Sequence, residues 1–182
     1  MIRSILKPVS YSLYLILFLL SSCNPVEDTA LTNLTYFDIK SYFLNEASRL
    51  TSHKLSVLKE VSKNEQKEKK LILIRDWQKE FDFFIESDIN KPSWTSSYKV
   101  ETKGDTTFYQ ALNPDLRTRV IQIIKDGNKI KSISIKNESL NKLYKSYEYL
   151  SYYPDSIYII EKEQQVRFLG ENKYKVTGRF TD

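Results

Sequence analysis

From Tyr98 onward, apolar and polar residues alternate with the period of two that is typical of β-strands. Short breaks separate the alternating segments, and three of the four glycines fall in these breaks, within KGD, KDGN and LGEN. Such residues form hairpin turns, and Asp126-Gly127 is the clearest example. Because short connections join neighbouring strands, we expect an antiparallel meander with strands at 97–103, 106–112, 117–125, 128–137, 142–153, 156–169 and 172–180.

Residues 35–50 show helical spacing instead. Thr35 can serve as the N-cap, and Asp38 suits the first turn of the helix. One face of this predicted helix is apolar and carries Ile39, Phe43, Ala47 and Leu50.

Residues 75–89 predict a second helix. Asp76 can cap it, and Pro92 biases the residue before it away from helical geometry, which ends the helix. Its broad apolar stripe consists of Trp77, Phe81, Phe84 and Ile85.

The segment between the two helices has two interpretations. A helix can run through Leu55, Leu58 and Val61, but the residues around these positions also alternate, as do residues 69–73. The β-branched residues and the polar break KNEQ favour a β-hairpin.

Together these elements predict one α+β domain over residues 35–182. We expect two N-terminal helices packed on an antiparallel, curved meander of about six to eight strands. The segment RVIQIIK is apolar on both faces, so both faces of the sheet need cover. We expect the helix at 75–89 on one face, and a groove, the first helix or a partner on the other.

The N-terminus has the features of a secretory signal. Arg3 and Lys7 precede an apolar run at 13–20, which is too short to span a bilayer, and small residues follow it. The segment LSSC resembles a bacterial lipobox, which implies cleavage after Ser22 and acylation of Cys23 by palmitate-type chains. The alternative is an uncleaved membrane anchor. In the lipobox interpretation, residues 1–22 are the signal peptide, and residues 23–34 are the lipidated cysteine and its tether.

Composition and charge argue against several kinds of chemistry. The net charge of +5 is spread along the chain, whereas nucleic-acid binding needs a concentrated basic face. With one histidine, His53, and one cysteine, a His/Cys zinc site is ruled out for practical purposes. Phosphate-binding and metalloprotease motifs are absent from the sequence. We therefore expect no catalytic residue, no metal, no cofactor and no enzyme activity; the glutamate pairs 161/163 and 80/86 are interpreted as surface charge.

A run of tyrosines is the most distinctive local feature. Tyr147, Tyr149 and Tyr153 fall on one face of a predicted strand, and Tyr144 and Tyr152 on the other. The first three form the candidate ligand-binding surface, because tyrosine combines apolar area with a polar tip. The alternative is that the tyrosines only pack under the helices.

The lipobox, the segment DWQKEFDFFIESDINKPSW and the C-terminal VRFLGENKYKVTGRF together resemble small uncharacterised lipoproteins of Bacteroidota-type Gram-negative bacteria. That resemblance implies one domain and transfers no functional residue. The order of elements is similar to the lipoprotein-carrier (LolA/LolB-like) half-barrel. By the sorting rule of enteric lipoproteins, Asn24 after the cysteine implies the outer membrane rather than the inner.

The expected function is therefore that of an envelope lipoprotein anchored to the membrane through acylated Cys23, with a non-enzymatic binding or assembly role. Its partner would be an envelope protein or an apolar ligand. The alternative is a lipid-binding or acceptor protein with a LolA/LolB-like cavity between sheet and helices, which predicts a continuous apolar concavity.

Overall fold

The computed structural model describes residues 34–181, which belong to a compact unit that begins at Leu34. The predicted signal peptide, Cys23 and the tether up to Asn33 lie outside the described residues. Within residues 34–181, no helix combines the length and the apolar character needed to cross a membrane.

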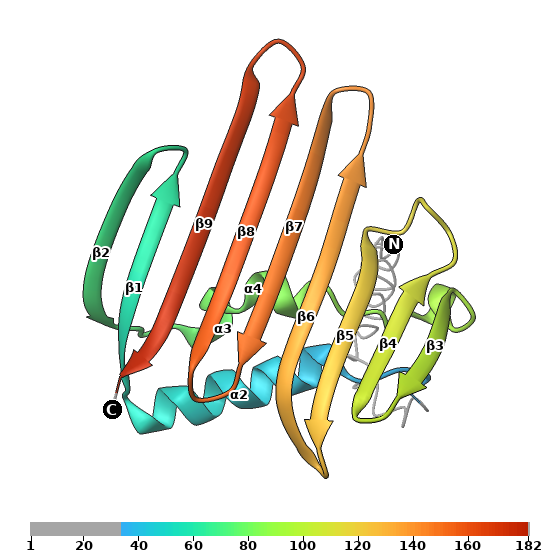
Figure 1. Cartoon of the computed structure of the whole chain (residues 1–182), viewed down its shortest axis with the longest axis horizontal. Helices are drawn as coiled ribbons and strands as arrows, with labels where there is room; N and C mark the ends of the chain where they lie inside the picture. The colour runs from blue at the N-terminus through green and yellow to red at the C-terminus, as the bar shows by residue number, and fades with distance from the viewer. Residues whose placement is uncertain (1–33, 182) are drawn as a thin grey trace, which may run out of the picture. The chain divides into compact units, whose positions relative to one another are not determined.

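Nine strands form a single antiparallel sheet in the order β2-β1-β9-β8-β7-β6-β5-β4-β3 (Figure 1). Seven of them follow one another as hairpins, as the period-two pattern predicts. The strands are β1 (Ser56–Lys63), β2 (Gln66–Leu73), β3 (Tyr98–Lys103), β4 (Thr106–Ala111), β5 (Thr118–Asp126), β6 (Lys129–Leu140), β7 (Tyr144–Tyr153), β8 (Ile157–Val166) and β9 (Gly170–Thr181).

The hairpin predicted between the helices is confirmed as β1 and β2. Its turn contains Asn64 with a φ of 54°, a left-handed conformation that asparagine tolerates better than most residues. β1 also pairs along its whole length with β9, from Ser56 opposite Thr181 to Lys63 opposite Tyr174. The hairpin therefore extends the sheet beside the last strand of the chain.

The first helix, α2 (Ile39–His53), begins four residues after the predicted cap. Asp38, not Thr35, is the N-cap, and its carboxylate accepts a hydrogen bond of 2.8 Å from the backbone N–H of Ser41. The four predicted apolar positions, Ile39, Phe43, Ala47 and Leu50, are all buried.

The second helix is shorter than predicted and is interrupted. Asp76 caps α3 (Trp77–Glu80) as expected, but Phe81 leaves helical geometry before α4 (Asp82–Ile85). A 3₁₀ turn, η1 (Pro92–Trp94), precedes β3. Bonds to the third preceding residue, such as those from the N–H groups of Phe84 and Ser87, tighten this segment.

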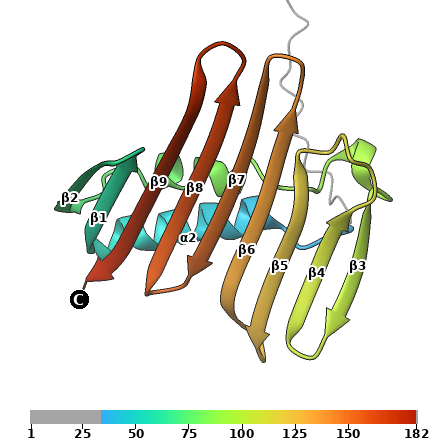
Figure 2. The same ribbon diagram turned by 45° about the horizontal axis from the view of Figure 1, so that its top comes forward.

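All these helices lie on one face of the sheet (Figures 1 and 2). We call this the inner face and the opposite one the outer face. Aromatic rings fill the space between helices and sheet: Phe43 stacks on Phe84 at 4.5 Å between ring centres and meets Tyr152 edge to face at 5.2 Å. Trp77, Phe81 and Tyr158 continue this cluster.

Two hydrogen bonds tie the helices to the central strands. The hydroxyl of Tyr152 on β7 donates to Glu46 of α2 at 2.5 Å, and that of Tyr158 on β8 donates to Glu80 of α3 at 2.6 Å. Both tyrosines are fully buried, and each hydroxyl reaches a carboxylate at the edge of the helix layer. Each bond also satisfies a polar group that burial would otherwise leave unpaired.

The predicted fold class, two helices on a meander of six to eight strands, is wrong. Within residues 34–181 the sheet has nine strands, and only α2 is a helix of ordinary length, with 15 residues against four each in α3 and α4. The physical reason is that three aromatic residues close together, at 77, 81 and 84, fill the inner face without a long helix to carry them. Both helical segments cover the same face, so neither covers the outer one.

Gly178 provides a test of the packing between β8 and β9. A Cβ atom at this position would overlap the ring of Tyr158, which lies directly opposite on β8. We expect Gly178→Ala to lower the free energy of unfolding by about 1–3 kcal/mol in urea titrations, because the buried ring has no space to move into. Thr177→Ala, the neighbouring change on the outer face, is the control and should cost about 1 kcal/mol or less. Equal losses in both variants would contradict this packing.

The buried tyrosines predict sensitivity to alkali. Burial raises the pKa of Tyr152 and of Tyr158 far above the ordinary value for tyrosine. The neighbouring carboxylate raises it further, Glu46 for Tyr152 and Glu80 for Tyr158. The unfolded chain releases these two protons near about pH 10. The stability that the two protonated hydroxyls contribute is therefore fully present below that pH and is lost as the pH rises above it. We expect the free energy of unfolding to fall by up to about 1.4 kcal/mol per pH unit for each tyrosine.

Urea unfolding at pH values between about 8 and 11 measures this slope. The double variant Tyr152→Phe/Tyr158→Phe should be less stable at neutral pH and show a shallower alkaline slope. An unchanged slope would mean that these two hydroxyls do not carry the effect.

Candidate binding surface

The outer face of the sheet carries the three tyrosines predicted to bind a ligand. Tyr149 and Tyr153 are 41% and 42% exposed and Tyr147 is half-buried, whereas Leu150 and Tyr152, on the inner face of the same strand, are buried. Alternation along β7 therefore separates the tyrosines as predicted. Tyr152 packs under the helices, and the candidate residues do not.

Charged pairs surround these tyrosines on the outer face. Tyr149 lies between Lys136 on β6 and Glu161 on β8, and the Lys136 ammonium sits 6.0 Å from the centre of its ring. Glu161 in turn pairs with Lys175 on β9 at 2.5 Å. The exposed tyrosine is thus held within a row of cross-strand charges.

A shallow hollow lies beside Tyr149 on the same face. Its volume is about 280 Å³, and the small side chains of Ser134 and Ser151 leave this space between the larger residues around them. Val120 and Gln122 border it on β5. It is smaller than the roughly 300–1,000 Å³ of typical small-molecule sites.

The second exposed surface lies where four strands end. β6 and β7 join at residues 141–143, β8 and β9 join at residues 167–169, and both turns project past the helices (Figures 1 and 2). We call residues 140–145 and 165–171 the hairpin tip. The N–H of Arg167 donates to the carbonyl of Leu143 at 2.9 Å, so a backbone hydrogen bond joins the two turns.

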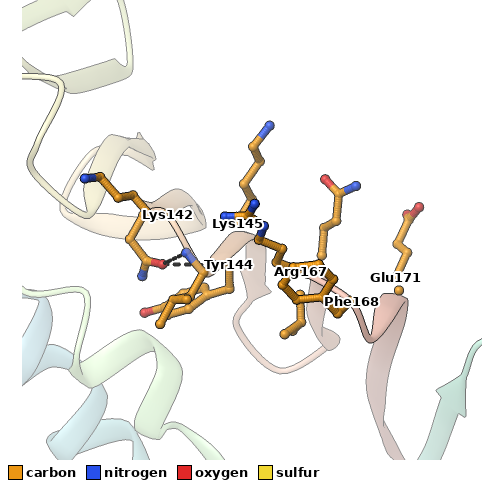
Figure 3. Close-up of a pocket in the computed structure, with 11 residues that line it drawn as sticks. Lys142, Tyr144, Lys145, Arg167, Phe168 and Glu171 are labelled. Atoms are coloured by element: carbon orange, nitrogen blue, oxygen red, sulfur yellow. Dashed lines mark hydrogen bonds between the residues drawn. The ribbon is translucent and has the colours of Figure 1, made fainter.

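Local hydrogen bonds shape both turns. The side chain of Asn141 accepts from the N–H groups of Leu143 and Tyr144 at 2.8 and 2.9 Å, which closes the first turn (Figure 3). In the second turn Phe168 has a φ of 71°, a conformation that is rare for a bulky residue. Its ring consequently points away from the sheet.

Large apolar side chains are exposed at this tip. The exposed fractions are 70% for Leu143, 91% for Phe168 and 79% for Leu169, and Leu140 adds 58%. A hollow of about 410 Å³ lies between the two turns, bordered by Tyr144, Lys145 and Arg167 among others (Figure 3). Single exposed apolar residues are common on protein surfaces, but a cluster of them is a candidate interaction site.

The charges at the tip are mostly basic. Lys142, Lys145 and Arg167 are exposed, and none of the three forms an ion pair within residues 34–181. The single acidic residue of the tip, Glu171, pairs with Lys173 at 3.2 Å. The Arg167 guanidinium lies 5.0 Å from the centre of the Phe168 ring. The tip therefore combines exposed apolar groups with uncompensated positive charge.

Sequence reasoning missed this tip. The segment LGEN was interpreted only as a turn between strands, and Leu143 was placed inside a strand. Leu143 and Phe168 are 25 positions apart in the sequence, and no local pattern shows that their turns lie together. The available signal was a pair of adjacent apolar residues, Phe168-Leu169, directly before a glycine turn.

A buried polar cluster on the inner face was also missed. Glu148 on β7 is 6% exposed and bonds to Arg117 at 2.6 Å and to Lys162 at 3.1 Å. Asn137 donates to Ser87 at 2.8 Å and to the same glutamate at 3.3 Å. Both carboxylate oxygens are therefore engaged, and the cluster joins β6, β7, β8 and the residue before β5 to Ser87, just after α4.

The other sequence-predicted residues have structural partners. His53 ends α2 and its Nδ1 lies 2.7 Å from the carbonyl oxygen of Arg49. Glu80 pairs with Lys59 at 2.6 Å and Glu163 with Lys173 at 3.4 Å. Residues 34–181 contain no group of three or more His, Cys, Asp or Glu side chains placed to hold a metal ion.

Comparison of the chain with models of protein families, with curated proteins and with solved structures finds no match in any of the three.

The two faces of β7 can be told apart by mutation. Tyr149→Ser/Tyr153→Ser should change the free energy of unfolding by about 1 kcal/mol or less, because both side chains lie on the outer face. Tyr152→Ser, on the same strand, should cost about 3–5 kcal/mol because it empties the centre of the aromatic cluster. Urea unfolding measures both. A large loss in the outer-face variant would show that these tyrosines serve packing instead of binding.

Proposed function

We propose that the protein is an envelope lipoprotein, anchored through acylated Cys23, whose domain has a non-enzymatic binding role at the membrane. The observation that carries the binding role is the hairpin tip, where Leu143, Phe168 and Leu169 are 70–91% exposed beside unpaired basic residues. Such side chains add nothing to the core, so this exposed cluster is available for contact with another molecule.

The arrangement of the sheet supports this proposal. The inner face is occupied by helices and by the polar cluster around Glu148, and the outer face and the tip face solvent. Away from the tip, the charged groups described above are bound to one another in pairs that hold strands and helices together. This is the pattern of a rigid scaffold that presents a surface.

The alternative of a lipid-carrying cavity receives less support. A LolA/LolB-like cavity needs space between sheet and helices, and here Phe43, Phe81, Phe84 and Tyr152 fill that region at ring distances of 4.5–5.9 Å. A ligand could enter only by displacing these rings, which are fully buried.

The anchor is tested by metabolic labelling with an alkyne analogue of palmitate in cells that produce the full chain. We expect label on the wild-type protein, which should fractionate with membranes, and none on Cys23→Ala. Ser22→Ala is the matched control, because it keeps a small residue before the cysteine and should be labelled normally. An unlabelled wild-type protein in the membrane fraction would contradict acylation and favour the uncleaved anchor.

A further inference from the structure

We propose that the hairpin tip inserts into the surface of an anionic phospholipid membrane and so orients the domain on the bilayer. This inference deepens the proposed function, since it names the partner of the exposed tip. It commits to a lipid surface, and a protein partner becomes an outcome of the test.

The first argument is the chemistry of the tip. Phe168 and Leu169 lie in one turn and Leu143 in its neighbour, and we call these three exposed apolar side chains the wedge. Lys142, Lys145 and Arg167 stand around this wedge (Figure 3). Apolar side chains that enter the acyl boundary beside basic side chains at the headgroups are the pattern of proteins that bind membrane surfaces.

The second argument is charge complementarity. The tip has three basic residues and one acidic residue, and the acidic one is already paired with Lys173. Because the three basic groups form no ion pair within the described residues, their full attraction to phosphate remains available. The long lysine and arginine side chains can also keep their charges at headgroup level while the turns go deeper.

The third argument is shape and rigidity. The tip is made of two adjacent turns that are joined by the bond from the Arg167 N–H to the Leu143 carbonyl. Asn141 closes the turn that carries Leu143 with two hydrogen bonds, so the backbone of that turn is fixed before any contact forms. A preformed wedge loses little conformational freedom when it inserts.

An acylated Cys23 would make even a weak tip contact effective. A flexible chain as long as residues 23–34 would reach roughly 17–20 Å, which would keep the domain close to the bilayer. The second contact is then intramolecular, so its effective concentration is high. The tip would set the orientation of the domain, while the acyl chains would supply the affinity.

The test uses the chain from Asn24 to Asp182 without acylation, so that the tip is measured alone. Residues from Leu34 onward form a compact unit with its own aromatic core and should fold without the signal peptide. Binding is measured by co-sedimentation with vesicles of phosphatidylcholine alone and of equal parts phosphatidylcholine and phosphatidylglycerol, with circular dichroism as the check on folding.

We expect binding to the anionic vesicles and at least tenfold weaker binding to the neutral ones. Phe168→Ser/Leu169→Ser should weaken anionic binding by at least tenfold, and neutralising Lys142, Lys145 and Arg167 to glutamine should weaken it by about fivefold for each charge. Matched controls at exposed sites away from the tip, Leu71→Ser/Leu73→Ser and Lys67→Gln/Lys69→Gln/Lys129→Gln, should bind like the wild type.

Equal binding by the wild type and the Phe168 variant, or equal loss in the tip and control variants, would overturn the inference. So would a folded wild-type domain that binds neither kind of vesicle. That last result, combined with palmitate labelling at Cys23, would leave the anchored lipoprotein standing and turn the search for the tip's occupant towards a protein.

Discussion

The ring of Phe43 is the contact on which the rest of the structure depends. It contacts Phe81 and Phe84 of the interrupted helical segment and Tyr152 at the centre of the sheet, so one side chain of α2 connects this helix, the interrupted segment and the sheet. A sheet must bury the apolar side chains of a face against another element, and here helices cover that face. Because α2 is the one helix of ordinary length in the described residues, large aromatic side chains cover the part of the inner face that a second long helix would otherwise cover.

Because the core lies on the inner face, the residues of the outer face have few contacts open to them. Its residues are left with cross-strand partners alone, and charge pairs such as Glu161–Lys175 provide them. The strands β6 to β9 also run past the helices, where neither face has cover. The exposed tip is therefore a consequence of strand length, since these four strands have 10–12 residues and β1 to β4 have six to eight.

Local features of the fold were predictable from the sequence, and its long-range features were not. Alternation and turn residues predicted each hairpin, and the apolar face of α2 from Ile39 to Leu50 was correct. The pairing of β1 with β9 has no local signal, because both strands alternate equally well alone. The same holds for the candidate site. The alternation of side chains along β7 was enough to place Tyr149 and Tyr152 on opposite faces of the sheet. That the turns with Leu143 and Phe168 lie side by side depends on the register between β7 and β8. The interruption between α3 and α4 at Phe81 also depends on tertiary packing, which the periodicity of the sequence does not indicate.

The pairing of β1 with β9 has a consequence for how the chain becomes folded. Ser56 meets Thr181, so the edge formed by β1 and β2 can join the sheet only after the last strand has been synthesised. Such distant pairings make folding slow, because a long loop must close before any contact stabilises it. A chain of this topology stays incomplete until its C-terminus is free. For the envelope lipoprotein proposed above, that delay would leave the chain extended for passage through a translocation channel.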